Sequence, residues 1–204
     1  MSKLYFKYST MNGGKSGILL MQAHQFEERG IPFLCLKSSI DTRDGEDIIC
    51  SRVGIKRECV SISPTDNLYT FVDRYIVNAA LQGLDKPLWI LVDEVQFLKP
   101  EQIDQLAKIV DKLDINVQCY GLRTDFTTHL FEGSKRLMEL ADDVEEIKVS
   151  CSCGRKAIIN ARFDANGKLI TNGEQILIGG NDLYAAVCRK CYNELLEKQY
   201  NNFF

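Results

Sequence analysis

The sequence predicts an α/β fold, a parallel sheet flanked by helices, followed by a small cysteine-rich unit. Two observations predict it. Apolar runs alternate with segments of helical period from residue 4 to residue 122, and two close cysteine pairs lie near the end of the chain. Alternating strands and helices are typical of parallel sheets with right-handed crossovers. With 204 residues, we expect an α/β domain over residues 1–147 and a smaller domain over residues 148–204.

The strands and helices of the larger domain follow from the spacing of apolar residues. The predicted strands are residues 4–8, 32–36, 88–92 and 116–120. Helices are predicted from residue 15 to Arg29, over residues 66–82 and around residues 103–113. The first of them is expected to end with Gly30 as its C-cap. Residues 38–54 have no clear period, many charges and two glycines, so we expect a long mobile loop there.

The segment between the first strand and the first helix has the composition of a phosphate-binding loop. Its residues are Ser9, Thr10, Met11, Asn12, Gly13, Gly14, Lys15 and Ser16. Small residues let successive backbone N–H groups approach a polyphosphate, Lys15 adds a positive charge, and the Ser16 hydroxyl can ligate Mg²⁺. The strict pattern has glycine where this chain has Ser9. The flanking strand and helix favour ATP binding over a chance match in a solvated turn.

An acidic pair, Asp93 and Glu94, follows the strand at residues 88–92. Ligands of open α/β sheets bind at the carboxyl ends of the strands, so the pair should face the phosphate loop. One carboxylate can hold Mg²⁺ directly or through water, and the other is free to accept a proton from a hydroxyl. The alternative is that Glu94 only caps a turn.

The eight cysteines fall into two groups. Four of them, Cys35, Cys50, Cys59 and Cys119, are interpreted as free thiols. The other four form two close pairs, Cys151 with Cys153 and Cys188 with Cys191. Four thiolates predict a closed and therefore structural zinc site, although the first pair is one residue shorter than the usual C-x-x-C.

Composition and charge exclude several classes of protein. The net charge is -3 with a pI near 5.5, and no Lys/Arg cluster is present, which argues against a dedicated nucleic-acid binder. No apolar run approaches the length of a membrane helix, and the N-terminus lacks a signal-peptide pattern. We therefore expect a cytoplasmic protein without membrane or nucleic-acid partners.

Taken together, the motifs resemble those of the type II thymidine kinases, the zinc-containing deoxynucleoside kinases of bacteria, animals and poxviruses. The similarity covers nearly the whole chain. It rests on the phosphate loop, residues 40–43, 93–97, 120–126 and 178–184, and the four paired cysteines. In Ser9 and in residues 120–126 the chain is similar to the branch typified by enteric bacteria.

This resemblance implies roles for the matching residues. The phosphate loop would hold ATP, with Mg²⁺ at Ser16 and Asp93. Asp41 and Arg43 would border the path of phosphoryl transfer, and Gln96 would be among the residues that bind ATP and Mg²⁺. Glu94 would be the base that accepts the 5′-hydroxyl proton of thymidine.

The family also covers its nucleoside with a long loop, the lasso, here residues 165–184, whose ends are tied by a zinc ribbon. The nucleoside site implied for this chain comprises Met11, Phe97, Leu122, Phe126, Phe131, Leu177, Gly179, Gly180 and Tyr184. For the aromatic and aliphatic members, core packing is the alternative role. A homotetramer and feedback inhibition by dTTP are implied as well.

Two other functions compete with this interpretation. A zinc-ribbon P-loop ATPase acting on nucleic acid would also carry Asp-Glu after a strand, but it needs an arginine finger and a basic track. A nucleotide-binding regulatory module would leave Glu94 without a role.

Overall fold

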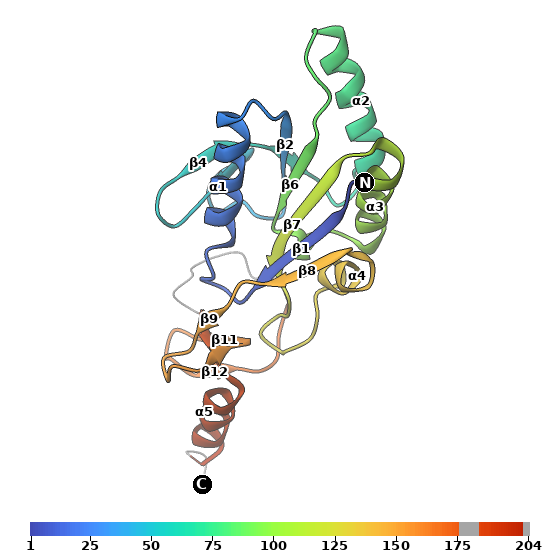
Figure 1. Cartoon of the computed structure of the whole chain (residues 1–204). Helices are drawn as coiled ribbons and strands as arrows, with labels where there is room; N and C mark the ends of the chain where they lie inside the picture. The colour runs from blue at the N-terminus through green and yellow to red at the C-terminus, as the bar shows by residue number, and fades with distance from the viewer. Residues whose placement is uncertain (176–183, 202–204) are drawn as a thin grey trace.

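The computed structural model describes residues 1–175 and 184–201, which are built around one six-stranded sheet (Figure 1). Every pair of neighbouring strands in it is parallel. In spatial order the strands are β5 (Val60–Ile62), β2 (Phe33–Ser38), β6 (Trp89–Asp93), β7 (Asn116–Leu122), β1 (Leu4–Ser9) and β8 (Asp143–Glu146). The predicted α/β class is confirmed.

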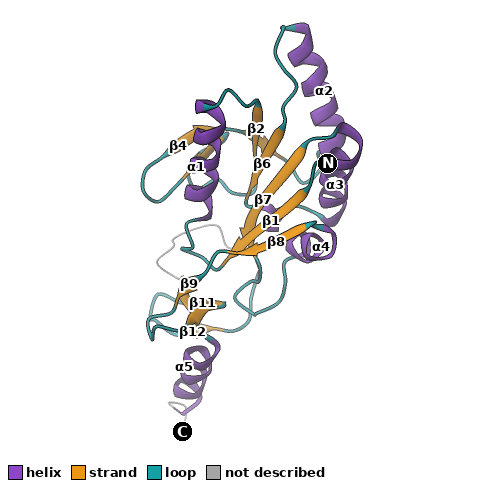
Figure 2. Cartoon of the chain, viewed as in Figure 1, coloured by secondary structure: helices purple, strands orange, loops and turns teal. Residues whose placement is uncertain are grey.

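Helices cover both faces of the sheet (Figure 2). On one face, α1 (Lys15–Glu28) buries Leu19, Leu20, Ala23 and Phe26 against β2, β6 and β7. The opposite face is covered by α2 (Leu68–Leu81), α3 (Pro100–Leu113) and α4 (Glu132–Leu140). Both faces of the sheet are therefore shielded from solvent, which explains why the central strands are unbroken runs of apolar residues.

Helix α1 ends as the sequence predicts. The Gly30 N–H donates to the carbonyl of Glu27 at 3.1 Å, and the Ile31 N–H donates to that of Phe26 at 2.9 Å. These two bonds satisfy carbonyl groups that the helix would otherwise leave free at its end.

The expectation of a long loop over residues 38–54 holds only in part. This segment contains β3 (Ile48–Cys50), which pairs antiparallel with β4 (Lys56–Glu58). Lys37, only 2 % exposed, donates its ammonium protons to the carbonyls of Gly45 at 3.0 Å and Ile48 at 2.8 Å. A buried cation on β2 thus holds the segment to the sheet, and no periodic pattern could reveal such a contact.

The C-terminal residues form a smaller body with its own apolar cluster, seen below the sheet in Figure 1. The cluster joins Ala157, Ile159, Ala161, Leu169, Val187 and Tyr192. The elements are β9 (Val149–Ser150), β10 (Lys156–Ala157), β11 (Ile159–Phe163), β12 (Leu169–Ile170), β13 (Tyr184–Val187) and α5 (Arg189–Asn201). Strand β9 pairs with β10, and β11 lies between β12 and β13. We call this body the ribbon.

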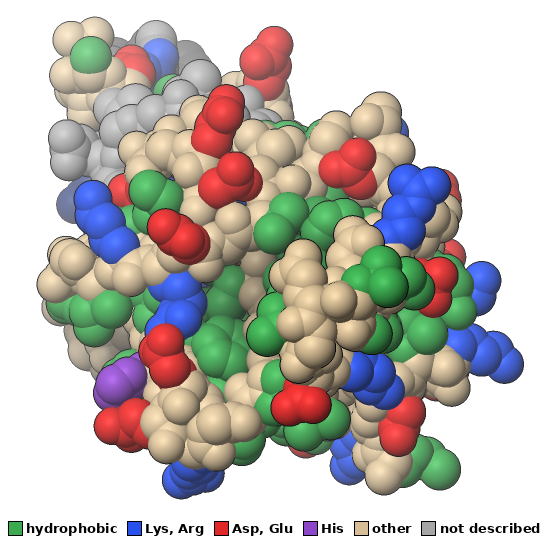
Figure 3. Space-filling view, turned by 90° about the horizontal axis from the view of Figure 1, so that it is seen from above, with side chains coloured by type: hydrophobic (Ala, Val, Ile, Leu, Met, Phe, Trp, Pro, Cys, Tyr) green, Lys and Arg blue, Asp and Glu red, His purple; other side chains and the backbone are tan. Residues whose placement is uncertain are grey.

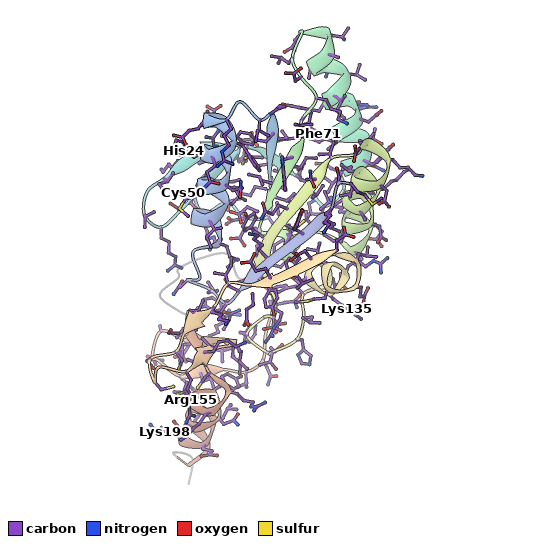
Figure 4. All side chains as sticks on the ribbon, viewed as in Figure 1. His24, Cys50, Phe71, Lys135, Arg155 and Lys198 are labelled. Atoms are coloured by element: carbon purple, nitrogen blue, oxygen red, sulfur yellow. The ribbon has the colours of Figure 1, made fainter. Side chains whose placement is uncertain are left out.

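The surface carries charges of both signs. On the face drawn in Figure 3, acidic and basic side chains are interspersed. Helices within the described ranges are too short or too polar to span a membrane. Neither histidine belongs to a buried site, since His24 lies on the outer side of α1 (Figure 4) and His129 is exposed.

Candidate active site

A cleft of about 790 Å³ opens where β1, β6 and β7 end, between the sheet and the ribbon. Three segments at the ends of these strands line the cleft: the phosphate loop after β1, Glu94 after β6, and Leu122, the last residue of β7. The carboxyl ends of parallel strands share one edge, so residues far apart in the sequence meet there.

The phosphate loop turns tightly because its residues are small. Asn12 and Gly14 have left-handed backbone conformations, with φ of 64° and 73°. At Gly13 a Cβ atom would lie 2.3 Å from Ser9 Oγ and 3.0 Å from Val149 Cγ2. Gly13 is therefore required by close packing, and its neighbours come from both the sheet and the ribbon.

Ser9, the departure from the strict loop pattern, contacts the loop lysine. Its hydroxyl donates to the Thr10 carbonyl at 2.6 Å and accepts from Lys15 Nζ at 3.2 Å. Lys15 Nζ also donates to the Thr10 carbonyl at 3.3 Å. Ser9, Thr10 and Lys15 are all buried. Thr10 Oγ1 has no hydrogen-bond partner within the described residues, so a buried polar atom of the loop is left for a ligand.

Glu94 lies in the cleft, and its own backbone is strained. Its φ of 54° is left-handed, although it is not glycine, and its side chain is 11 % exposed. Such backbone strain clusters at functional sites. Its carboxylate has a donor on each oxygen: Arg43 Nη2 at 2.8 Å from Oε1, and Gln96 Nε2 on Oε2.

Arg43 connects the two acids that the sequence places near the transfer path. Its Nε donates to Asp41 Oδ1 at 2.6 Å, while its Nη2 bonds both Asp41 Oδ2 and Glu94. Burial lowers the pKa of Arg43, but the bonds to Asp41 and the charge of Glu94 outweigh that effect and raise it. The guanidinium is therefore a fixed positive charge beside Glu94.

Asp93 and Lys15 are buried ionisable groups at the base of the cleft. Burial raises the pKa of Asp93 to about 7, and the charge of Glu94 adds to the rise, whereas Ser16 and Lys15 oppose it. Burial also lowers the pKa of Lys15, which Glu94 and Asp93 oppose. Both charged forms are thus disfavoured until charges of the opposite sign arrive. A polyphosphate with a divalent cation supplies both signs, so these residues fit Mg²⁺ and ATP.

Apolar side chains form the opposite wall of the cleft. The rings of Phe97 and Phe131 meet edge to face, with centroids 6.1 Å apart at 82°. Phe126, Leu122, Met11 and Tyr184 line the same space. The predicted nucleoside contacts Leu177, Gly179 and Gly180 lie outside the described residues. An apolar wall facing a polar floor suits a flat base joined to a polar sugar.

The four paired cysteines meet in the ribbon. The Sγ atoms of Cys151, Cys153, Cys188 and Cys191 all lie within 4.8 Å of one another. Tetrahedral zinc with Zn–S bonds of about 2.3 Å needs sulfur atoms roughly 3.8 Å apart, and Cys153 and Cys188 are separated by 3.6 Å. Hydrogen bonds from the backbone of Cys153 and Cys188 lower the pKa of Cys151 to about 6, whereas the thiols of Cys153 and Cys188 raise the pKa of Cys191 to about 12. A bound cation would favour the thiolate form of all four cysteines. The donor set therefore fits a metal ion.

Comparison with known proteins decides the family. The family model described as thymidine kinase matches residues 2–192. The chain belongs to the thymidine kinase family. It is 43% identical to the thymidine kinase of Legionella pneumophila (strain Lens) over 100% of both chains. Identity to the thymidine kinase of Vibrio vulnificus is 46%, over 97% of this chain and 100% of the relative. The kinase of Ruegeria pomeroyi is 46% identical over 95% of each.

A solved structure of the Pif1 helicase from Candida albicans superposes with a TM-score of 0.40 at 13% identity, over 72% of this chain and 36% of that one. That similarity is too distant to bear on function. The family and its named members confirm the ATP-dependent nucleoside kinase activity expected from the sequence.

The structure places most predicted site residues of this thymidine kinase family member around one cleft. Ser9, Thr10 and Asp93 lie buried beneath its surface rather than on it. Gln96, expected beside ATP and Mg²⁺, bonds Glu94 and accepts the Leu122 N–H at 2.9 Å.

Sequence reasoning missed several residues that line the cleft: Gly17, Asp44, Cys50, Ser51, Arg52, Val53, Thr124, Asp125, Asn160 and Gln175. Asp125 organises its own turn, since its Oδ1 accepts from the backbone N–H groups of Thr127 and His129. Its Oδ2 accepts from Gln175 Nε2 at 2.8 Å. A buried acid in a motif already quoted was the signal that could have identified this residue.

Proposed function

We propose that this chain transfers the γ-phosphoryl group of ATP to the 5′-hydroxyl of thymidine, giving dTMP and ADP, and that it also accepts deoxyuridine. One observation carries the proposal: Lys15 of the phosphate loop and the doubly hydrogen-bonded carboxylate of Glu94 face a single cleft with an apolar wall. Phosphoryl transfer needs a polyphosphate site, a base and an acceptor pocket side by side.

In this proposal the phosphate loop holds ATP. Lys15 and the backbone N–H groups of Asn12, Gly13 and Gly14 balance the phosphate charge, while Ser16 and Asp93 hold Mg²⁺, which neutralises charge on the transferred group. Arg43, fixed by Asp41, lies between the phosphates and Glu94. Glu94 accepts the proton of the 5′-hydroxyl as the new O–P bond forms.

The nucleoside lies against the apolar wall. Phe97, Phe126 and Phe131 enclose the base, Met11 and Leu122 meet its 5-methyl group, and Tyr184 covers the deoxyribose. Leu177, Gly179 and Gly180 are proposed to bind the thymine edge. Deoxyuridine lacks a single methyl group, which is worth only about 1–3 kcal/mol in an apolar pocket.

The remaining proposals concern architecture and regulation. Residues 1–147 act as the ATP-binding domain, and residues 148–204 as a domain that covers the nucleoside and is closed by structural zinc on the four clustered cysteines. We further propose a cytoplasmic homotetramer inhibited by dTTP. Light scattering of the purified protein and a dTTP titration of its activity test the last two statements.

The deciding experiment incubates the protein with ATP, Mg²⁺ and each nucleoside in turn. Formation of dTMP that requires thymidine supports the proposal. Hydrolysis of ATP that needs no nucleoside, and rises with added DNA or RNA, would instead indicate a nucleic-acid ATPase. Binding of ATP without any turnover would indicate a regulatory module.

A further inference from the structure

Asn160 joins three segments that are distant in the sequence. It lies on β11 of the ribbon and is 2 % exposed. Its Oδ1 accepts the backbone N–H of Met11 in the phosphate loop at 2.7 Å. Its Nδ2 donates to the carbonyl of Thr124, beyond the end of β7, at 2.9 Å. One side chain of the ribbon therefore holds both sides of the cleft floor.

The bond to Met11 constrains how the phosphate loop presents its donors. Each backbone N–H of such a loop can point either toward a bound anion or toward the protein. At Met11 the N–H points toward the protein, because it donates to Asn160 Oδ1. The loop then turns through Asn12 and Gly14, whose backbones are left-handed.

A second ribbon residue touches the same loop. Val149 Cγ2 lies 3.0 Å from the position that a Cβ on Gly13 would occupy. The loop is thus held at Met11 by a hydrogen bond and at Gly13 by packing, and both contacts come from the ribbon. The remaining support comes from β1 and α1, which flank the loop in the chain.

We propose that Asn160 is a positioning residue for the phosphate loop, so that the ribbon shapes the ATP side of the cleft as well as the nucleoside side. The inference rests on the proposed function, because it assumes that the loop binds ATP. It differs from a direct role in binding thymidine, which would require the Asn160 amide to face the base instead of the loop.

Two variants test the proposal. Asn160→Leu removes both hydrogen bonds and approximately keeps the volume of the side chain. Asn160→Ala removes both hydrogen bonds and most of the side-chain volume. Asn193→Ala is the matched control, because Asn193 is an exposed asparagine on α5 of the same ribbon and does not line the cleft. Calorimetry then measures the affinity for ATP with Mg²⁺ and, separately, for thymidine.

Both Asn160 variants should bind ATP about tenfold or more weakly, the effect of losing a buried hydrogen bond. Thymidine affinity should change by less than about threefold, which is the effect expected of a substitution that removes no direct contact with the ligand. Unchanged ATP affinity would overturn the proposal, as would a loss that thymidine shares equally or that is confined to thymidine.

Amide hydrogen exchange of the wild-type chain gives a test that needs no variant. The Met11 amide should be protected in the absence of substrates, like other hydrogen-bonded amides. Exchange at the rate of an unprotected amide would overturn the proposal even if the variants fail to fold. Failure of the proposed function would be separate, since it would appear as a wild-type protein that forms no dTMP.

Discussion

Gln96 links the carboxylate of Glu94 to the neighbouring strand. Its Nε2 donates to Glu94 Oε2, and its Oε1 accepts the Leu122 N–H at 2.9 Å. Gly121 makes room for this arrangement, because a Cβ there would lie 2.7 Å from Gln96 Oε1. Together with Arg43 on Oε1, Gln96 fixes the orientation of the carboxylate.

Gln96→Leu should therefore lower kcat by roughly 10–10² while KM for ATP and thymidine stays within about threefold, because Glu94 loses its orientation and no substrate contact is removed. Gly121→Ala should act in the same direction by displacing the amide. Steady-state kinetics of both variants, with the exposed Gln25→Leu as control, check the prediction. A rise in KM at constant kcat would show that Gln96 binds substrate directly.

Lys15→Met should reduce phosphoryl transfer by roughly 10²–10³ or more, since the variant removes a charge that stabilises the transition state. The protein should remain folded and its melting temperature should not fall, because the methionine keeps the buried stem and removes a desolvated ammonium. Activity and thermal unfolding are measured together with ATP binding. Normal turnover would remove the phosphate-loop assignment.

Asp93 predicts a pH dependence of stability. Its folded-state pKa is raised to about 7. Between the unfolded pKa near 4 and pH 7 the folded protein binds the additional proton, so this contribution to stability is present at low pH and is lost as the pH rises through 7. Asp93→Asn removes the titrating group. It should be more stable than wild type at pH 8, by roughly 2–4 kcal/mol, and the difference should vanish toward pH 4.

Urea unfolding of both proteins between pH 4 and pH 8 measures this difference. The variant should also lose activity, since it lacks the carboxylate proposed for Mg²⁺. A stability difference that does not vary with pH, or a variant less stable than wild type at pH 8, would show that the charge of Asp93 does not destabilise the folded state.

Zinc removal should weaken both substrates. The apolar cluster of the ribbon is small, so the thiolates supply much of its folding energy. Cys151→Ser should lose the metal and loosen Asn160 and Val149, which hold the phosphate loop, whereas Cys59→Ser should keep one zinc per chain. Elemental analysis and binding measurements check this. A metal-free chain that binds thymidine and ATP with wild-type affinity would contradict it.

The central sheet could be predicted because its strands are buried on both faces and read as apolar runs. Strands β5 and β8 were missed for opposite physical reasons. Val60–Ile62 is too short to show a period. Asp143–Glu146 is a charged edge strand without an apolar pattern, and it is a strand because it pairs with β1. The segment before the β3–β4 hairpin is bonded to β2 through Lys37, a buried side-chain contact that leaves no periodic pattern in the sequence.

At the site, sequence motifs located the phosphate loop, the acidic pair and the cysteines, since each is local in the chain. Contacts between motifs could not be read from spacing. Met11 donating to Asn160 and Leu122 donating to Gln96 depend on how segments distant in the chain are brought together. The bonds of Lys15 to Ser9 and of Gln96 to Glu94 lie within one motif and depend on how its turn is folded.

The most direct test of the account replaces Glu94 by glutamine, which keeps the shape and removes the base. Single-turnover transfer from γ-labelled ATP to thymidine should slow by roughly 10²–10⁴. Thymidine affinity, measured by calorimetry on the same preparation, should remain within about threefold of wild type. Labelled dTMP formed at a near-normal rate, or thymidine binding lost with the chemistry intact, would contradict the assignment of Glu94 as the base.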